Sequence, residues 1–439
     1  MGSYVPSTTA ERADMLAQLG LTSEEDLFSV IPAGVRLKQL DLPEGLSELE
    51  LRETMEAAAA RNTRFSTLFR GAGAYRHYIP AMVKSVAANE TFLTAYTPYQ
   101  AEISQGVLQA IFEYQTMICQ LTGMEVSNAS VYDGATAAAE AIVMCQERRR
   151  SRAVVSGAVH PDVLAVITTY CASHQIPLTV LPADGGVTDP AALAQVLGED
   201  AACVYIQTPN YYGLLEDADA LVAAAHAAGA KAILGVNPIA LGLLKTPGAC
   251  GADIAVGEGQ PLGLPLGFGG PYLGFMACTK ALMRKLPGRI VGQTSDSRGD
   301  RAFVLTLQAR EQHIRREKAS SSICSNEALC ALTASVYLAA MGPQGIAQAA
   351  EQCLSKAHYA AQKITEVPGF RLVYGKPFFH EFVTTCPVPA ETLNHALAEH
   401  GMLGPLPLEG NRLLWCVTEV VSKARIDEMA ALLKEVCKV

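Results

Sequence analysis

The chain has 439 residues, which suggests two or three domains, because a single hydrophobic core rarely grows beyond about 250–300 residues. Half of the residues are hydrophobic and 18% are charged, so there is enough apolar surface to exclude disorder over most of the chain. The formal net charge of −9 argues against non-specific nucleic-acid binding, which needs a basic surface.

The sequence carries no visible targeting signal. Residues 1–6 have neither a basic nor an apolar signal region, and we expect no membrane-spanning helix. The 12 cysteines are scattered without a CxxC pair or a compact Cys/His group, which predicts reduced thiols and no metal site. Together these features predict a cytoplasmic protein that binds neither membrane nor nucleic acid.

Residues 1–102 are expected to form a helical N-terminal segment followed by an aromatic loop. The capping-box patterns Thr8–Glu11 and Thr22–Glu25 precede apolar residues at helical spacing, and residues 49–61 repeat that spacing. The stretch 65–102 is irregular and rich in Tyr, Pro and Gly. A long loop of this kind in a compact protein is typical of a functional or an assembly surface.

Residues 103–341 are expected to form a large α/β domain, because short apolar runs alternate with helical segments. The predicted strands are 153–155, 178–181, 202–206 and 232–236, and the predicted helices between them are 160–174, 189–197 and 217–228. Strand, helix and strand in repetition, with short connections, predict a mainly parallel sheet with helices on both faces.

Residues 342–439 are expected to form a smaller C-terminal α/β domain. In chain order the pattern predicts a long helix at 345–365, strands at 370–373 and 381–385, another helix, a strand at 412–417 and a last helix at 423–437.

Several common catalytic motifs are absent. The chain has no GxxxxGK[ST], no HExxH, no GxSxG and no GxGxxG after a predicted strand. A P-loop nucleotidase, a zincin, an α/β-hydrolase and a Rossmann dehydrogenase are therefore disfavoured.

Two local features suggest a ligand at the edge of the predicted sheet. The turn Tyr132–Thr136 leads into an Ala-rich helix over 137–148, and free N–H groups at a helix start attract anions. These residues alone leave open both a phosphate cradle and a plain helix start. His160 follows an apolar strand, where α/β sheets bind ligands, and can either stack on a planar ring or be structural.

Six segments in a fixed order carry a resemblance to a known family. They are GAGAY at 71–75, TPYQAEISQG at 97–106, YDGAT at 132–136, QTPN at 207–210, GEGQ at 257–260 and FGGPYLG at 268–274. Together they resemble the P-protein of the glycine cleavage system, glycine dehydrogenase (decarboxylating), and within that family the N-terminal-type subunit 1. The resemblance covers nearly the whole chain. It implies the α/β fold of pyridoxal-phosphate-dependent transferases of fold type I, which is the aspartate aminotransferase type.

The resemblance also implies a reaction and its partners. A homologous subunit 2 that bears pyridoxal phosphate (PLP) would decarboxylate glycine together with this chain, as an enzyme of the oxidoreductase class. The aminomethyl group would then pass to the lipoyl group of the H-protein, which acts as co-substrate. The cofactor would be held by the partner, and this chain alone would bind none.

The resemblance places amides where a PLP enzyme needs two other groups. Gln260 stands at the position of the Schiff-base lysine, and Asn237 lies near that of the aspartate facing the pyridine nitrogen. An amide can neither form an imine nor stabilise a pyridinium as a carboxylate does. We therefore expect no catalytic residue in this chain itself. The vestigial cofactor-pocket candidates are Tyr132, Asp133, Gly134, Thr136 and His160.

Enzymes of this fold build their active sites at subunit interfaces, so the aromatic loop offers residues that complete a partner's site. The candidates are Tyr96, Tyr99, Gln100 and Glu102. Two alternatives remain open. The chain is an autonomous PLP-dependent transferase or lyase that uses a non-standard lysine, or it is a purely structural scaffold subunit.

Overall fold

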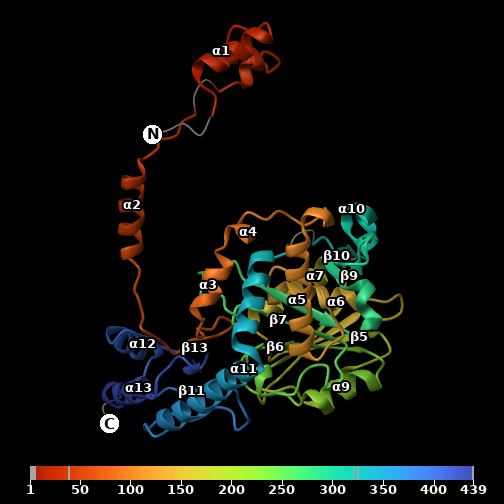
Figure 1. The fold of residues 1–439 in the computed structure, drawn as a ribbon. Coiled ribbons are helices and arrows are strands. Elements are labelled where there is room, and N and C mark those ends of the chain that lie inside the picture. Colours follow the sequence, from red (N-terminus) through yellow and green to blue (C-terminus); the bar gives the residue numbers. More distant parts are fainter. Residues whose placement is uncertain (1–5, 38–39, 320, 324–325, 438–439) are drawn as a thin grey trace. The chain divides into compact units, whose positions relative to one another are not determined.

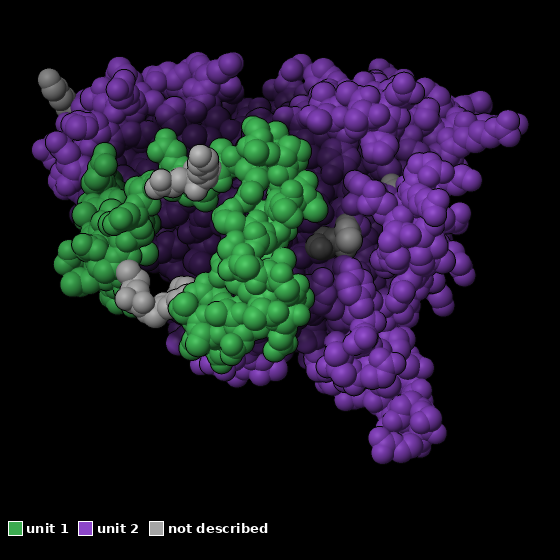
Figure 2. Space-filling model, turned by 90° about the horizontal axis from the view of Figure 1, so that it is seen from above, with its two compact units in different colours: residues 1–64 green, residues 65–439 purple. Residues whose placement is uncertain are grey.

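The computed structural model describes residues 6–37, 40–319, 321–323 and 326–437. The chain divides into two compact units, residues 1–64 and residues 65–439, and each is described by itself (Figure 2). The division into residues 1–102, 103–341 and 342–439 stays a prediction, and its outermost residues, 1–5 and 438–439, lie outside the described part.

The first unit consists of short helices. Helix α1 (Thr9–Gln18) begins as its capping box predicts, because the backbone N–H of Glu11 donates to the Thr8 hydroxyl and the Glu11 carboxylate accepts from Thr8 N. Helix α2 (Glu48–Ala60) begins with an equivalent box. Neither helix contains a buried residue.

The second predicted capping box is displaced by one residue. The 3-10 helix η1 (Glu24–Phe28) begins after Ser23, and Asp26 accepts the backbone N–H groups of both Thr22 and Ser23. The carboxylate that caps this turn is therefore that of Asp26 and not that of Glu25, because Ser23 and not Thr22 takes the cap position. A short 3-10 helix, η2 (Ala33–Val35), follows.

A seven-stranded sheet forms the centre of the second unit (Figure 1). Its order is β2 (Val126–Ser127), β8 (Gly274–Cys278), β7 (Ile254–Glu258), β6 (Lys231–Val236), β5 (Ala201–Thr208), β3 (Arg152–Ser156) and β4 (Leu178–Leu181). The run from β7 to β4 is parallel, while β8 is antiparallel to both of its neighbours. The four predicted strands and the mainly parallel sheet are confirmed.

Successive side chains of a strand enter two different cores, which is why the strands are apolar on both faces. Val204 and Ile206 of β5 pack in one core, and Cys203 and Tyr205 pack in the other. The first core is covered by α5 (Gln105–Thr122), α8 (Pro190–Val196), α9 (Ala218–Ala227) and α11 (Ala328–Thr365), the second by α6 (Gly134–Met144) and α7 (Pro161–Ser173). The prediction of helices on both faces is confirmed.

The C-terminal region adds a small antiparallel sheet in the order β11 (Glu381–Thr385), β14 (Arg412–Cys416) and β13 (Leu406–Leu408). Helices α12 (Ala390–Glu399) and α13 (Lys423–Val436) pack on it together with α11. The strand predicted at 370–373 is wrong, because this segment makes only an isolated bridge between Leu372 and Thr384.

Helix α11 is longer than the helix predicted at 345–365, because it begins at Ala328. By length and composition alone it is apolar enough to cross a membrane. Its backbone is not helical at Gly342, where φ is 60° and ψ is 177°, and Pro343 follows this break. The two parts on either side of the break contribute buried side chains, such as Tyr337 and Ile364, to the protein's cores. The apolar composition of α11 is therefore that of a core helix.

The remaining described elements are short. They are β1 (Thr67–Leu68), which pairs with β12 (Met402–Leu403); the hairpin β9 (Ile290–Ser295) and β10 (Arg301–Thr306); α3 (Ala81–Ala87), α4 (Glu90–Leu93) and α10 (Gln312–Arg315); and the 3-10 turns η3 (Ala101–Ile103), η4 (Ala240–Gly242), η5 (Lys280–Lys285), η6 (Gln308–Arg310) and η7 (Arg316–Lys318).

A buried carboxyl group on α6 gives a stability prediction. Glu140 accepts a hydrogen bond from Ser321 Oγ (2.9 Å), and burial raises its pKa from 4.5 to about 7. The folded state therefore holds this proton more tightly than the unfolded state, and stability is lost as the pH rises from 4.5 through 7. Glu140→Gln should raise the free energy of unfolding by about 1–3 kcal/mol at pH 8 and by less at pH 5.

Urea unfolding at both pH values measures this effect. Glu199→Gln is the matched control, because Glu199 is exposed and its amide should change the stability little at either pH. An equal gain for both variants, or a gain for Glu140→Gln that does not depend on pH, would contradict the assignment.

Candidate functional site

A cavity of about 420 Å³ lies at the carboxyl edge of the parallel strands. His160 follows β3, Gln207 lies at the end of β5, Asn237 follows β6, and Glu258 ends β7. The start of α6, at Asp133 and Gly134, also lines this cavity. The carboxyl edge is where open α/β sheets bind ligands, so the cavity is the first candidate site of the chain.

The start of α6 is neutralised by the protein's own carboxylates. Asp133 Oδ1 accepts the backbone N–H of Thr136 (2.7 Å), and Glu258 Oε2 accepts that of Gly134 (2.9 Å). These donors and the helix dipole would otherwise attract an external anion. Of the predicted vestigial residues, Asp133, Gly134 and His160 line the cavity, whereas Tyr132 and Thr136 do not.

Glu258 is held entirely by backbone groups. Besides Gly134, its carboxylate accepts the N–H groups of Gln260 (2.9 Å) and Leu273 (3.0 Å). Burial nevertheless raises its pKa to about 7, because the three hydrogen bonds offset only part of the desolvation. This carboxyl group therefore titrates near neutrality.

Gln260 is buried and has a structural partner on each side of its amide. Its Oε1 accepts Tyr75 N (2.9 Å), while its Nε2 donates to Tyr75 O (2.9 Å) and to Leu264 O (2.8 Å). A lysine has no acceptor and cannot make the first of these bonds. The side chain at this position thus fastens residues 71–75 and does not line the cavity.

Asn237 does line the cavity, but its carbonyl oxygen is already used. Oδ1 accepts the backbone N–H groups of Ile239 (2.9 Å) and Ala240 (3.2 Å), which closes the turn after β6. An Asn in such a turn is a common local solution.

Residues 71–75 pack against His160. His160 Nδ1 accepts the backbone N–H of Asp162 (3.1 Å), so the proton is on Nε2, which donates to Ala72 O (2.9 Å). A methyl group added at Gly73 would lie 3.1 Å from the same Nε2. The imidazole is therefore engaged by the chain itself on both nitrogens.

Two residues that line the cavity, Glu381 and His380, were not among the predicted site residues. Glu381, the first residue of β11, accepts Ala72 N (2.7 Å) and the Tyr75 hydroxyl (2.8 Å), and burial raises its pKa to about 7. His380 precedes it and is buried, with no hydrogen-bond partner on either ring nitrogen. The available signal in the sequence was a His-Glu pair at the start of a short strand. Its contact with Tyr75 could not be predicted, because the two lie about 300 residues apart in the sequence.

These residues do not fit pyridoxal phosphate. Four carboxylates line the cavity (Asp133, Asp162, Glu258 and Glu381), and no Lys or Arg is among its lining residues. A phosphate group would meet negative charge at the helix start, and the lining offers no amine for an aldehyde. Lys245, which forms an ion pair with Asp219 (2.7 Å), and Lys280 do not line the cavity either.

The residues predicted to complete a partner's active site lie on a different surface. Tyr96 and Tyr99 are 82% and 55% exposed, with ring centroids 6.4 Å apart. Both line an open cavity of about 700 Å³ together with Gln100, whereas Glu102 is exposed outside its lining. The Arg289 guanidinium, itself buried, donates to the Tyr99 hydroxyl (3.3 Å) and lies 5.5 Å from the ring centroid. The structure therefore groups three of the four candidates and fixes one of them.

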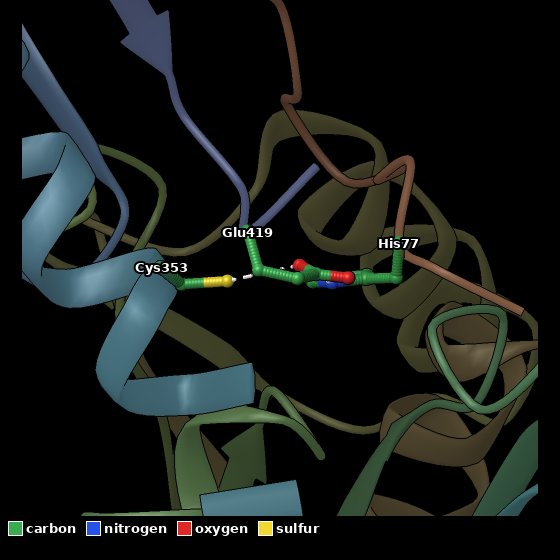
Figure 3. A group of neighbouring side chains, drawn as sticks. All are labelled: His77, Cys353 and Glu419. Atoms are coloured by element: carbon green, nitrogen blue, oxygen red, sulfur yellow. Dashed lines mark hydrogen bonds and ion pairs between the residues drawn. The ribbon is translucent and has the colours of Figure 1, made fainter. Parts of the chain in front are cut away.

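A third group joins segments that are distant in sequence. The side chains of His77, Cys353 and Glu419 point toward one another, and their ligand atoms lie within 4.8 Å (Figure 3). Glu419 accepts from His77 Nδ1 (2.7 Å), from the Cys353 thiol (3.3 Å) and from Tyr78 N (2.6 Å). Burial raises the pKa of Cys353 well above its ordinary value, which opposes the thiolate that a metal ion needs. We interpret this triad as a hydrogen-bonded tie between segments.

Comparison with known proteins gives consistent matches. The family described as "Glycine cleavage system P-protein" matches residues 2–433. The "Probable glycine dehydrogenase (decarboxylating) subunit 1" of Moorella thermoacetica is 51% identical, over 98% of this chain and 99% of the relative. The crystal structure of an inhibitor-bound "glycine decarboxylase (P-protein) of the glycine cleavage system" superposes with a TM-score of 0.94 at 46% identity, covering 99% of this chain and 100% of the other.

A more distant neighbour shows the fold alone. Aspartate aminotransferase of subgroup IV from Thermus thermophilus superposes with a TM-score of 0.59 at 16% identity, over 85% of this chain and 99% of the other. The predicted fold class, the PLP-dependent transferase type, is confirmed.

Proposed function

The chain belongs to the glycine cleavage system P-protein family, and we propose that it is the glycine dehydrogenase subunit that completes an active site whose PLP is held by a partner. The partner in this proposal is the homologous PLP-bearing subunit 2. Together the two subunits decarboxylate glycine and transfer the aminomethyl group to the lipoyl arm of the H-protein. The name "subunit 1" of the relatives supports the existence of a partner subunit.

The observation that carries the division of labour is the composition of the cavity at the sheet edge. Glu258 and Asp133 occupy the start of α6, and Gln260 fastens residues 71–75. PLP supplies an electron sink for the loss of CO2 wherever it is bound. No step of that chemistry is assigned to this chain's own cavity, because the cavity offers neither a lysine nor a cation for the phosphate.

The exposed aromatic surface supports a role beyond scaffolding. Tyr96, Tyr99 and Gln100 line an open cavity, and Arg289 contacts both the hydroxyl and the ring of Tyr99. Exposed aromatic side chains that are fixed by a buried cation are suited to enter a partner's pocket, since little side-chain entropy is lost on docking. In the proposal these rings wall the glycine pocket, and Gln100 and Glu102 offer hydrogen bonds.

The N-terminal unit offers a second surface for a partner. Within residues 6–64, large apolar side chains are exposed, among them Leu27, Phe28, Val30, Leu49 and Met55. Exposed apolar groups gathered on one segment are typical of an interface between subunits.

Borohydride reduction tests the proposal. The chain alone, incubated with PLP and reduced, should yield no pyridoxyl-lysine peptide, whereas the two-subunit complex should yield one from the partner only. Peptide mass spectrometry identifies the labelled chain, and glycine-dependent CO2 exchange measures activity. A pyridoxyl-lysine in this chain alone, at Lys245 or Lys280 for example, together with glycine turnover, would instead support an autonomous PLP enzyme.

A further inference from the structure

The cavity at the sheet edge has an unbalanced charge. Four carboxylates line it, and neither Glu258 nor Glu381 forms an ion pair with any described residue. The hydrogen bonds that they receive come from neutral groups, which are backbone N–H groups and the Tyr75 hydroxyl. The start of α6 offsets the charge of Glu258 only in part, and a bound cation would offset the remaining cost of burying these carboxylates.

A second and independent feature is the unpartnered imidazole of His380. Its side chain lines the cavity, is only 1% exposed, and has no hydrogen-bond partner on either nitrogen. Burial lowers the pKa of His380 to about 3, so the ring is neutral, and one of its two buried nitrogens keeps a lone pair without a partner. Buried polar atoms are almost always paired, so a ligand with an N–H donor suits this site.

Aromatic rings complete the lining. Tyr75, Tyr205 and Tyr272 contribute to the same cavity. Ring faces attract cations through their quadrupole, and they do so more strongly when the cation is desolvated. Aromatic and carboxylate groups around one space recur in sites for organic cations.

We propose that this cavity binds a small organic cation with N–H donors, a primary alkylammonium, and excludes ligands that carry a phosphate. The inference goes beyond the proposed function, since it concerns a ligand of this chain's own cavity and not the partner's cofactor. Glu381 and Glu258 supply the counter-charge, and His380 accepts a hydrogen bond from the ammonium group.

A divalent metal ion fits this space less well than an alkylammonium. Ca²⁺ needs six to eight oxygen ligands close together, whereas the oxygens of Glu258 and Glu381 are already shared with backbone or hydroxyl donors. Among the described residues, the group whose ligand atoms converge closely enough for a metal is the triad at Glu419 and not this cavity.

The affinity should rise with pH. Protonated Glu258 and Glu381 attract no cation, so binding releases protons and strengthens as both carboxyl groups ionise around pH 7. The groups facing them do not add a competing cation. They are Asp133, Tyr114 and Cys330 around Glu258, and Tyr75, Tyr211 and Cys416 around Glu381, with the neutral His380 in the lining. His160 also lies in the lining, and its ring nitrogens bond to Asp162 N and Ala72 O. Burial raises the pKa of each of these phenols and thiols, so they stay neutral.

Titration calorimetry on the full-length chain and on the two-subunit complex tests the proposal, with ethylammonium chloride as the probe and potassium chloride at equal ionic strength as the reference. A dissociation constant of about 1 mM is expected, near the ceiling for a ligand of three heavy atoms. Binding should be about 10-fold tighter at pH 8 than at pH 6. Inorganic phosphate should neither bind nor compete.

Three variants locate the site. Glu381→Gln and Glu258→Gln should each weaken ethylammonium binding about 10-fold, and His380→Phe about 5-fold. Glu140→Gln is the matched control, because Glu140 is also a buried carboxyl with a raised pKa but does not line the cavity. Circular dichroism establishes that each variant is folded, and a glutamine keeps a carbonyl oxygen for the backbone donors.

The proposal is overturned if ethylammonium binds no more tightly than potassium, if phosphate binds in its place, or if the folded Glu381→Gln and Glu258→Gln proteins keep the full affinity. The first and third outcomes leave open which subunit holds PLP, and borohydride labelling decides that question on its own, so the two proposals can fail separately.

Discussion

In the assembled two-subunit enzyme, Tyr99→Ala should lower kcat/KM for glycine about 100-fold, the loss expected when a group that positions substrate is removed. Tyr99 is half exposed, shares an open cavity with Tyr96 and Gln100, and is fixed by Arg289. A ring held in this way serves as a rigid wall for a neighbouring subunit's pocket. Its loss should therefore reduce turnover without dissociating the two subunits.

The measurement pairs glycine-dependent CO2 exchange with size-exclusion chromatography of the complex. Tyr78→Ala is the control, because Tyr78 is another exposed tyrosine that does not line the cavity at Tyr99. Tyr99→Phe separates the ring from its hydroxyl, which accepts the bond from Arg289. If Tyr99→Ala forms an intact complex with full turnover, as the Tyr78 control should, the chain is a scaffold and the lending proposal is wrong.

Trp415→Ala should destabilise the protein by about 3–5 kcal/mol, the usual range for removing a large buried aromatic side chain. Trp415 lies in β14, is fully buried, and donates its indole N–H to Thr384 Oγ1 (2.9 Å) in β11. Its ring meets Phe69 edge to face with centroids 6.3 Å apart. The substitution therefore removes packing area, one hydrogen bond and an aromatic pair together.

The expected result is a lower urea midpoint, followed by far-UV circular dichroism because the variant lacks the chain's single tryptophan. Leu372→Ala is the control, since Leu372 is partly exposed and should cost much less. Phe382 of β11 pairs with Trp415, next to Glu381, so the ethylammonium affinity should fall as well. A loss of stability no greater than that of Leu372→Ala would show that Trp415 is not an anchor of this sheet.

Much of the fold follows from short stretches of sequence. The strands at 153–155, 178–181, 202–206 and 232–236 were predicted because fully buried parallel strands are continuous apolar runs. Pro161 and Gly229 mark a helix start and a helix end through their own backbone preferences, and Gly229 has the positive φ of 73° that a helix stop favours. These signals are local, so one sequence suffices to detect them.

Other predictions failed where a local pattern competes with packing. Residues 370–373 have strand-forming side chains, but they find only one bridging partner, at Thr384. The helix predicted at 345–365 is also longer in the structure, because α11 begins at Ala328 and continues past the break at Gly342 as a bent core helix. The apolar composition of a segment predicts that it is buried, but it does not show which other parts of the protein pack against it.

The sequence by itself determined the class of fold, the amides at positions 237 and 260, and the likeness to the family, since these depend on residue identities and their order along the chain. Only the tertiary structure decided what those amides do. Gln260 bonds to Tyr75, Glu258 caps a helix that starts at Gly134, and Glu381 with His380 reaches the same cavity from the C-terminal sheet. The reason is physical. The charge, the burial and the unpaired hydrogen-bonding groups of a site depend on residues that are close in space but far apart in the sequence.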